Sequence, residues 1–360
     1  MERIVISRHG EPDVLSRETT LDPDPGPGQV RVRVDAVGVN FADVMIRMGL
    51  YPDAGALPLV PGFEASGTID AVGEGVDPSR VGESVVALMK QGAYAEALVV
   101  RSDFALAIPE GLDPVTAAAL PVNGLTAYQI LEVMAPPRPG ETVLVHGAAG
   151  GVGTLAVQLA QRRGATVMGS ASPAKHEFLR SLGVATVFDS RKRNFAATVK
   201  AATNGHGADV VLEPRHGRWI LESYKAAAPA GRIVMHGFAA AASGKKGSRW
   251  AALRTVLEAP WLQVNPISLM NDNKALMGIN LGRMWSESDR LLTWLSELLA
   301  MAATGAITPV IDRVLPLEKA ALAHHRLQDR ANVGKIVLVT RRFRDAGSAG
   351  WDVHEEGGGS

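Results

Sequence analysis

The sequence predicts an α/β protein with two domains, a doubly wound parallel sheet and a second, smaller β-rich domain. Three observations support this prediction. A chain of 360 residues is too long for one small core. Its first third contains short strands separated by Gly and Pro, as in a small irregular barrel. Its middle part alternates strands with helices, which is typical of a parallel sheet covered by helices.

In the first third, the segment 30–34 alternates Val with Arg, which indicates a half-buried strand. It follows a turn-rich segment of Asp, Pro and Gly at 22–28. A short helix is expected to end near Met48. Asp43 and Arg47 are spaced to pair on this helix, and we expect a solvated pair worth a few tenths of a kcal/mol.

The middle part and the end of the chain follow a regular order of predicted elements. Strands are expected at 165–170, 184–189, 208–212, 231–236 and 275–281, and helices at 173–182, 194–203, 217–227 and 286–302. A last pair of strands, around 307–314 and 335–339, flanks a helix at 317–328. The segment 244–285 interrupts this order with Trp, Leu and basic residues, which favours a helical lid or interface element over a membrane-surface helix. The polar, Gly-rich segment 343–360 is expected to be disordered.

The stretch 143–153 is an apolar run that breaks into glycine and continues as a helix. Strand, glycine turn and helix in this order form the first half of a nucleotide-binding βαβ unit. Gly150 would let the backbone approach a pyrophosphate, and Gly153 would let the helix pack against its strand. We therefore predict that a dinucleotide binds at the helix start, where backbone N–H groups favour phosphate. The residues of this turn are Ala149, Gly150, Gly151, Val152 and Gly153.

The second strand of this unit predicts which coenzyme binds. An acid at its end would hold the ribose hydroxyls and repel a 2′-phosphate, but the strand ends in Gly and Ser. Ser172 and Lys175 follow at a helix start and provide a hydroxyl and an ammonium group that suit a phosphate. Arg191, beyond the third strand, would add positive charge, although a solvated loop is an equally good interpretation. The sequence thus predicts NADPH rather than NADH.

Composition excludes several kinds of protein. Lys plus Arg equals Asp plus Glu, at 37 each. This balance argues against a nucleic-acid surface and against a basic patch that binds membranes. The chain has no cysteine, so disulfides and Cys-bound zinc are excluded, and a reducing, cytoplasmic location is expected. No signal peptide is evident, because Glu2 and Arg3 lead directly into an apolar strand. The nine histidines show no metal-ligand spacing.

Several motifs together resemble the zinc-independent quinone oxidoreductase branch of the medium-chain dehydrogenase/reductase superfamily. They are the glycine turn at 148–153, Arg8–Leu15, Gly38–Asp43, Gly49–Pro52, Pro61–Glu64 and Gly124–Tyr128. The segments 250–281 and 331–335 are more similar to the vesicle amine transport protein homologues of that branch. The resemblance implies a GroES-like domain from 1–124 and 306–342, and a Rossmann domain from 125–305. It also implies a homodimer joined through an edge strand near 275–281.

The same resemblance implies a site without metal. Where zinc relatives bind their catalytic metal through Cys, His and Glu, this chain has Asn40, Phe63 and Glu64, so we predict no metal ion. The resemblance places three candidates near the reaction. They are Asn40, near the nicotinamide ribose or the substrate oxygen; Tyr51, able to donate to an enolate; and Thr126, near the nicotinamide amide. An Asx turn, a packed aromatic ring and a capping hydroxyl before a helix at 127–133 are their respective structural alternatives. Further coenzyme contacts are implied for Gly237, Phe238, Asn332 and Lys335.

Two positions depart from the pattern of the family. After the fourth Rossmann strand relatives tend to carry Asp-x-x-Gly-Gly, whereas this chain has Glu213, Pro214, Arg215, His216 and Gly217. Beside a coenzyme cleft, Arg215 and His216 could bind an acidic group or donate a proton, or equally form a surface turn. Ser190 replaces a tyrosine near the adenosine phosphate, and Arg191 could compensate. The leading hypothesis is an NADPH-dependent, zinc-independent reductase of quinones or α,β-unsaturated carbonyls. Alternatives are a tailoring enoyl reductase of natural-product synthesis and a nucleotide-binding regulatory or membrane-associated protein with little turnover.

Overall fold

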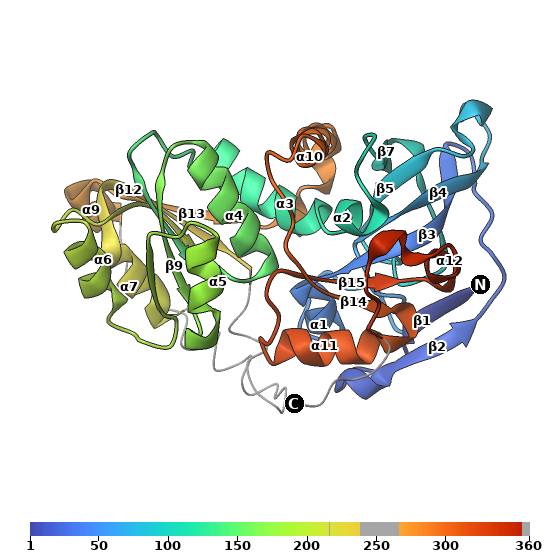
Figure 1. Cartoon of the computed structure of the whole chain (residues 1–360), viewed down its shortest axis with the longest axis horizontal. Helices are drawn as coiled ribbons and strands as arrows, with labels where there is room; N and C mark the ends of the chain where they lie inside the picture. The colour runs from blue at the N-terminus through green and yellow to red at the C-terminus, as the bar shows by residue number, and fades with distance from the viewer. Residues whose placement is uncertain (216, 238–265, 355–360) are drawn as a thin grey trace. The chain divides into compact units, whose positions relative to one another are not determined.

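The computed structural model describes residues 1–215, 217–237 and 266–354 of the chain. Contacts between residues divide these into two compact units. The first unit contains 1–122 and 285–354, and the second contains 123–237 and 266–284. The boundaries expected from the sequence assign 285–305 to the Rossmann domain, whereas these residues group with the first unit. The domain boundaries stay a prediction. Figure 1 shows the helices and strands of both units.

The first unit is built on β-structure. Among the described residues, seven strands form one sheet with the order β14-β15-β3-β4-β5-β7, and β6 pairs with β3. β1 and β2 form a separate antiparallel pair. The strands are β1 (Glu2–Ile6), β2 (Leu15–Thr19), β3 (Gln29–Val39), β4 (Glu64–Val72), β5 (Ser84–Leu88), β6 (Ala97–Arg101), β7 (Ala105–Ala107), β14 (Ile311–Pro316) and β15 (Lys335–Val339). The helices are α1 (Phe41–Arg47), α2 (Pro114–Ala118), α10 (Ser288–Ala303), α11 (Ala320–Gln328) and α12 (Arg341–Asp345).

The long strand β3 illustrates why this sheet forms. Val30, Val32 and Val34 are fully buried on one face, as the alternation in the sequence predicts. On the other face, the guanidinium groups of Arg31 and Arg33 both donate to the carboxylate of Asp70 on β4, over 2.8 and 2.5 Å. Apolar burial and cross-strand ion pairs therefore fix the same register.

The second unit is a six-stranded sheet, within the described residues, with the order β10-β9-β8-β11-β12-β13 and only parallel pairs. Its strands are β8 (Thr142–His146), β9 (Thr166–Ala171), β10 (Thr186–Asp189), β11 (Ala208–Glu213), β12 (Ala227–His236) and β13 (Ala275–Ile279). Its helices are α4 (Gly151–Arg162), α5 (His176–Ser181), α6 (Phe195–Ala202), α7 (Arg218–Ala226) and α9 (Pro266–Asp272). The chain runs from β8 outward on one side and from β11 outward on the other, so the strand order reverses between them. Ligands of such sheets bind at this switch point, outside the carboxyl ends of the strands.

The predicted architecture, a doubly wound parallel sheet with a second, β-rich domain, is confirmed. Three local expectations were wrong. Thr126 does not cap a following helix, because it lies inside α3 (Pro121–Tyr128), which continues as a π-helical turn to Met134. The helix expected at 173–182 is a three-residue 3-10 turn followed by the short α5. The segment 343–354 is ordered, because Phe343 is buried and the Trp351 indole N–H donates to Asp113 over 2.8 Å.

Four features named from the sequence lie wholly or largely on residues that are not described. Most of the interrupting segment 244–285 lies outside the described residues, as do His216, Phe238 and the end of the tail at 355–360. Within the described part of the chain, no helix has both the length and the apolar character needed to cross a membrane.

Candidate functional site

The glycine turn after β8 lies at the switch point of the parallel sheet. α4 begins at Gly151, and Gly150 occupies the N-cap position without a side chain to cap the helix. The first N–H groups of a helix have no partner within it, so this helix start provides backbone donors and a positive dipole end. The arrangement suits a phosphate group, as the sequence predicts.

The glycines of this turn differ in how much space surrounds the position of a Cβ atom. A Cβ atom on Gly153 would lie 2.3 Å from the carbonyl oxygen of Gly147, so this glycine allows the helix to pack on the turn. A Cβ atom on Gly151 would lie 2.0 Å from the side-chain nitrogen of Asn123. At Gly150 the nearest atom would be 3.3 Å away, so the local fold there leaves more room. Packing therefore constrains Gly153 most strictly, because its neighbours are backbone atoms, and Gly150 is the least crowded of the three.

The side chains expected around the 2′-phosphate follow β9 and β10. Ser172 precedes the 3-10 turn that contains Lys175, and both are partly exposed. Because α5 has only six residues, its dipole contributes less than the sequence suggested. Arg191 is largely exposed, and its guanidinium donates to the Asp189 carboxylate over 2.8–3.1 Å. These hydrogen bonds lower the pKa of Asp189 to about 2, so an anionic group stands beside Arg191.

In the first unit, a buried group of three side chains joins β3, β4 and β15; we call Asn40, Glu64 and Lys335 the Asn–Glu–Lys cluster. The Lys335 ammonium donates to the Asn40 side-chain oxygen and to Glu64 Oε1, each over 2.6 Å. Asn40 Nδ2 donates to the same Oε1 over 2.7 Å. The backbone N–H of Val122 donates to Glu64 Oε2 over 2.7 Å. All three side chains are at least 96% buried, which makes these pairings strong.

The Asn–Glu–Lys cluster does not fit a metal ion. Glu64 is the carboxylate that the resemblance places at the metal position of zinc relatives, but Lys335 already supplies its cationic partner. Asn40 and Phe63 provide neither a thiolate nor an imidazole, which are the usual zinc ligands. Among the described residues, no group of three or more His, Asp or Glu side chains is arranged to hold a metal. The donor set therefore disagrees with metal binding at this position.

The other candidate residues are not members of the Asn–Glu–Lys cluster and have their own local surroundings. Tyr51 packs its ring edge-on against Phe63, with centroids 5.9 Å apart, in a cluster with Ile6, Ile46 and Leu59. Asn332 is buried and donates from Nδ2 to the carbonyl oxygen of Gly334 over 2.8 Å. In the second unit, Thr126 is partly buried in α3, and the exposed Gly237 follows β12 with a φ of +69°.

Asp43 and Arg47 do not form the solvated pair expected from their spacing, since both are fully buried. Asp43 accepts hydrogen bonds from the backbone N–H groups of Asn40 and Gly62 over 2.8 and 3.0 Å. Burial raises the pKa of Asp43 to about 7, against the opposing effect of these bonds. Spacing along a helix could not show that this face points into the protein.

A chain of buried polar groups connects Arg47 with Asp43, through two residues that the sequence did not single out for this site. Arg47 Nε donates to His324 Nδ1 over 3.3 Å, so the His324 proton is on Nε2. That N–H lies 3.2 Å from the Tyr94 hydroxyl, which donates to Asp43 over 3.3 Å. Burial, followed by the charge of Arg47, lowers the pKa of His324 to about 3 and keeps it neutral.

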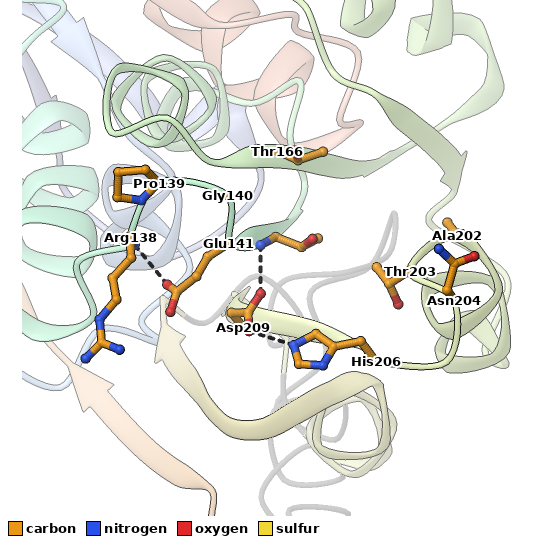
Figure 2. Close-up of a pocket in the computed structure, with 11 residues that line it drawn as sticks. Arg138, Pro139, Gly140, Glu141, Thr166, Ala202, Thr203, Asn204, His206 and Asp209 are labelled. Carbon is orange, nitrogen blue, oxygen red and sulfur yellow. Dashed lines mark hydrogen bonds and ion pairs between the residues drawn. The ribbon is translucent and has the colours of Figure 1, made fainter.

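A cavity of about 590 Å³ lies elsewhere in the second unit. Figure 2 shows its lining, which includes Thr142 and Thr166, the first residues of β8 and β9. It therefore lies at the amino ends of the strands, away from the glycine turn at their carboxyl ends. Its polar groups are paired with one another: Asp209 accepts from Thr142 N over 2.8 Å and lies 3.0 Å from His206 Nε2. No residue expected to bind the coenzyme lines it.

The sheet, the glycine turn and the β-rich unit define a class of protein, the two-domain dehydrogenases. Comparison with family models agrees. Residues 26–110 match the alcohol dehydrogenase GroES-like domain, and residues 182–338 match the zinc-binding dehydrogenase model.

Individual relatives narrow the class. The synaptic vesicle membrane protein VAT-1 homolog of Homo sapiens is 39% identical over 310 residues, covering 85% of this chain and 78% of the relative. The Danio rerio homolog is 38% identical, and the match covers 87% of this chain but only 64% of the relative's length. The quinone oxidoreductase of Rattus norvegicus is 31% identical over 94% of this chain and 98% of its own. The chain belongs to the medium-chain dehydrogenase/reductase superfamily, with VAT-1 homologues and quinone oxidoreductases among its relatives.

Solved structures are similar along nearly the whole chain. A mycobacterial protein complexed with NADPH has a TM-score of 0.81 at 30% identity, covering 94% of this chain and 100% of that one. CurK enoyl reductase has a TM-score of 0.78 at 32% identity, covering 94% and 99% respectively. An oxidoreductase of this superfamily that acts on a small molecule with a nicotinamide coenzyme is consistent with these neighbours.

Proposed function

We propose that this chain is an NADPH-dependent oxidoreductase that transfers hydride, without a metal ion, to a quinone or an α,β-unsaturated carbonyl compound. The observation that carries the proposal is the Asn–Glu–Lys cluster, in which Lys335 and Asn40 both donate hydrogen bonds to the Glu64 carboxylate. Reduction of a simple ketone places charge on one oxygen, which zinc would stabilise as a Lewis acid. Hydride addition to a conjugated system spreads that charge over an enolate, which hydrogen bonds can support.

The residues of the second unit fit the coenzyme. The start of α4 offers donors to a pyrophosphate, and Ser172 and Lys175 follow the strand that lies beside the ribose in such sheets. NADPH, when bound, supplies the hydride. The mycobacterial neighbour complexed with NADPH supports this choice of coenzyme. Thr126, Gly237, Phe238 and Asn332 remain proposed contacts.

The hydrogen bonds of Asn40 refine its proposed role. Both of its amide hydrogens have partners, Glu64 Oε1 at 2.7 Å and the Gly38 carbonyl oxygen at 3.3 Å. The side-chain oxygen accepts from Lys335 and keeps a second lone pair. Asn40 is therefore suited to accept a hydrogen bond from a ribose hydroxyl rather than to donate to a substrate carbonyl.

Lys335 has the complementary capacity. Two of its three N–H groups point to Glu64 and Asn40, and an ammonium group has three donors. The third is proposed to donate to a coenzyme or substrate oxygen. Tyr51, packed on Phe63, is proposed as a wall of the substrate site that can donate to the developing enolate.

The dimer and the cellular location also remain proposals. β13 is an edge strand of the described sheet, and its pairing with a second copy would extend the sheet across a homodimer. Because the chain spans 64% of the Danio rerio relative, activities of the whole relative are not transferred to it. A cytoplasmic location is proposed from the absence of cysteine.

A panel assay tests the function. Purified protein is mixed with NADPH or NADH and with quinones, enones, an enoyl thioester or simple ketones, and coenzyme oxidation is followed with and without a chelator. We expect turnover of conjugated acceptors with NADPH, unchanged by the chelator. Stoichiometric zinc by elemental analysis, or turnover of simple ketones alone, would contradict the proposal. Binding of NADPH without turnover of any acceptor would instead favour a regulatory protein.

A further inference from the structure

Arg215 lies two residues after the end of β11, and its side chain is held flat by contacts on its edges and on one face. Its Nε and Nη2 donate to the two oxygens of Glu213 over 2.7 and 2.9 Å. Its Nη1 donates to the carbonyl oxygen of Ser190 over 3.3 Å. The guanidinium carbon lies 3.9 Å from the centre of the Trp219 ring. A planar group with its edges bound and an aromatic ring against it has few remaining conformations.

Glu213, which binds Arg215, is itself held in place by Ser223 and His146. It is fully buried and accepts a hydrogen bond from the Ser223 hydroxyl over 2.6 Å. His146, the last residue of β8, has Nε2 3.5 Å from the same carboxylate oxygen and Nδ1 2.9 Å from the Ser170 hydroxyl. Burial lowers the pKa of His146 to about 3, so the ring stays neutral. Two strands and a helix therefore hold the Glu213–Arg215 pair in place.

The position of this pair is that of the adenosine end of a dinucleotide. Ser190, which contacts Arg215, directly follows β10, and its N–H donates to the carbonyl oxygen of Ala171 over 2.9 Å. Ala171 ends β9 one residue before Ser172, where the adenosine ribose is recognised in such sheets. On the other side, Pro214 lies next to Gly147 of the glycine turn. Arg215 thus lies at the carboxyl ends of the strands around the switch point.

The pairing of its charge shows what Arg215 can recognise. Three of its five N–H groups have partners, and the Glu213 carboxylate balances its positive charge. Burial raises the pKa of Glu213, but the hydrogen bonds and charge of Arg215 and the hydrogen bond from Ser223 lower it, so this carboxylate stays ionised. A guanidinium that is neutralised in this way is a poor reader of phosphate. Trp219 covers one face of the guanidinium, and the side chain is 12% exposed. The opposite face is the one suited to stacking on a flat ring.

We infer that Arg215 is a specificity residue that stacks on the adenine ring of the coenzyme and does not read the 2′-phosphate. The inference rests on the proposed function, since it requires a dinucleotide at this turn. Stacking depends on the adenine ring, which all three nucleotides share, and not on the 2′-phosphate of the adenosine ribose. Binding of NADPH, NADH and 5′-AMP should therefore depend on Arg215 to the same degree. Lys175 and Arg215 would then divide the recognition of phosphate and base between them.

Arg215→Lys provides the test, because lysine keeps the positive charge beside Glu213 but lacks the plane. Dissociation constants of NADPH, NADH and 5′-AMP are measured by calorimetry for this variant and for the wild type. We expect each to weaken about tenfold, with an unchanged NADPH-to-NADH ratio. Arg218→Lys is the matched control, because Arg218 is exposed on the first turn of α7 and should leave all three affinities unchanged.

Other outcomes would overturn the inference. Unchanged affinities for Arg215→Lys would show that the plane is not used, and a selective loss of NADPH would show that Arg215 reads the phosphate. If the lysine variant does not fold, the double variant Glu213→Gln with Arg215→Ala removes both charges and so leaves no unpaired buried carboxylate. The double variant should show the same uniform loss. Failure of the wild type to bind any of the three nucleotides would instead refute the proposed function itself.

Discussion

Lys335 and Asn40 are 295 positions apart in the chain, yet the ammonium of Lys335 donates a hydrogen bond to the side-chain oxygen of Asn40 over 2.6 Å. β15 runs antiparallel to β3 and brings Lys335, which begins β15, close to Asn40, which follows the end of β3. Glu64, at the start of β4, accepts from both. Gly38 makes room for this carboxylate, since a Cβ atom there would lie 2.4 Å from Glu64 Oε1.

Replacing Lys335 with Met should strongly destabilise the first unit. The change leaves Glu64 as a buried carboxylate without its cationic partner, which costs about 3–5 kcal/mol in comparable pairs. The free energy of unfolding in urea measures the effect. The double variant Lys335→Met with Glu64→Gln removes both charges and should recover a large part of the loss. An equal loss in the single and double variants would show that Lys335 contributes by packing alone.

His324 should make the first unit sensitive to acid. In the unfolded chain a histidine takes up a proton near pH 6.5, whereas burial holds the pKa of His324 in the fold at about 3. The unfolded state therefore binds more protons between these values, and stability is lost as the pH falls from 6.5 toward 3. His324→Gln removes this titration, so the stability advantage of the wild type over the variant should shrink across that range.

The control for this prediction is the neighbouring residue. His325 is half exposed, so His325→Gln should keep the slope of the wild type when unfolding is measured from pH 7 to pH 4. An unchanged difference between wild type and His324→Gln at every pH would contradict the proposed neutral state of His324. The raised pKa of Asp43 has the opposite effect, because the folded state then binds more protons and gains stability as the pH falls. The wild type and the variants share this contribution.

Lys175→Ala should reduce the preference for NADPH. If the ammonium contacts the 2′-phosphate, its loss removes a charge-assisted bond worth about 1.5–3 kcal/mol, and NADH binding should change little. The dissociation constant of NADH divided by that of NADPH measures this preference. Arg191→Ala is expected to lower the ratio less, because Asp189 already binds that guanidinium. A ratio that stays constant in both variants would refute the assignment of the phosphate site.

The sequence could predict features that depend on neighbours along the chain. Alternation in 30–34 and the apolar run before Gly147 identify β3 and β8 because side-chain periodicity is a local property. The fold class followed from such runs. The Asn–Glu–Lys cluster could be predicted only as three separate candidates, since their contacts span 24 to 295 positions.

Buried polar residues were the features that the sequence concealed. Asp43 and Arg47 have the spacing of a surface pair, and the apolar pattern around them does not show which face of α1 is covered. Tyr94, His324 and Glu213 obtain their partners from distant strands and helices. A polar side chain satisfied across the fold looks the same in the sequence as one that is solvated.

The glycine turn offers a test that separates packing from ligand binding. Gly153→Ala would place a Cβ atom 2.3 Å from the Gly147 carbonyl oxygen, and such overpacking typically costs about 1–3 kcal/mol. Gly150→Ala meets its nearest atom at 3.3 Å, and the φ of −86° suits alanine. We therefore expect a lower melting temperature for Gly153→Ala. For Gly150→Ala we expect a smaller loss of stability than for Gly153→Ala, together with at least tenfold weaker NADPH binding, because a methyl group would occupy the approach of the pyrophosphate. Normal NADPH binding by Gly150→Ala would mean that phosphate does not contact the backbone at this residue.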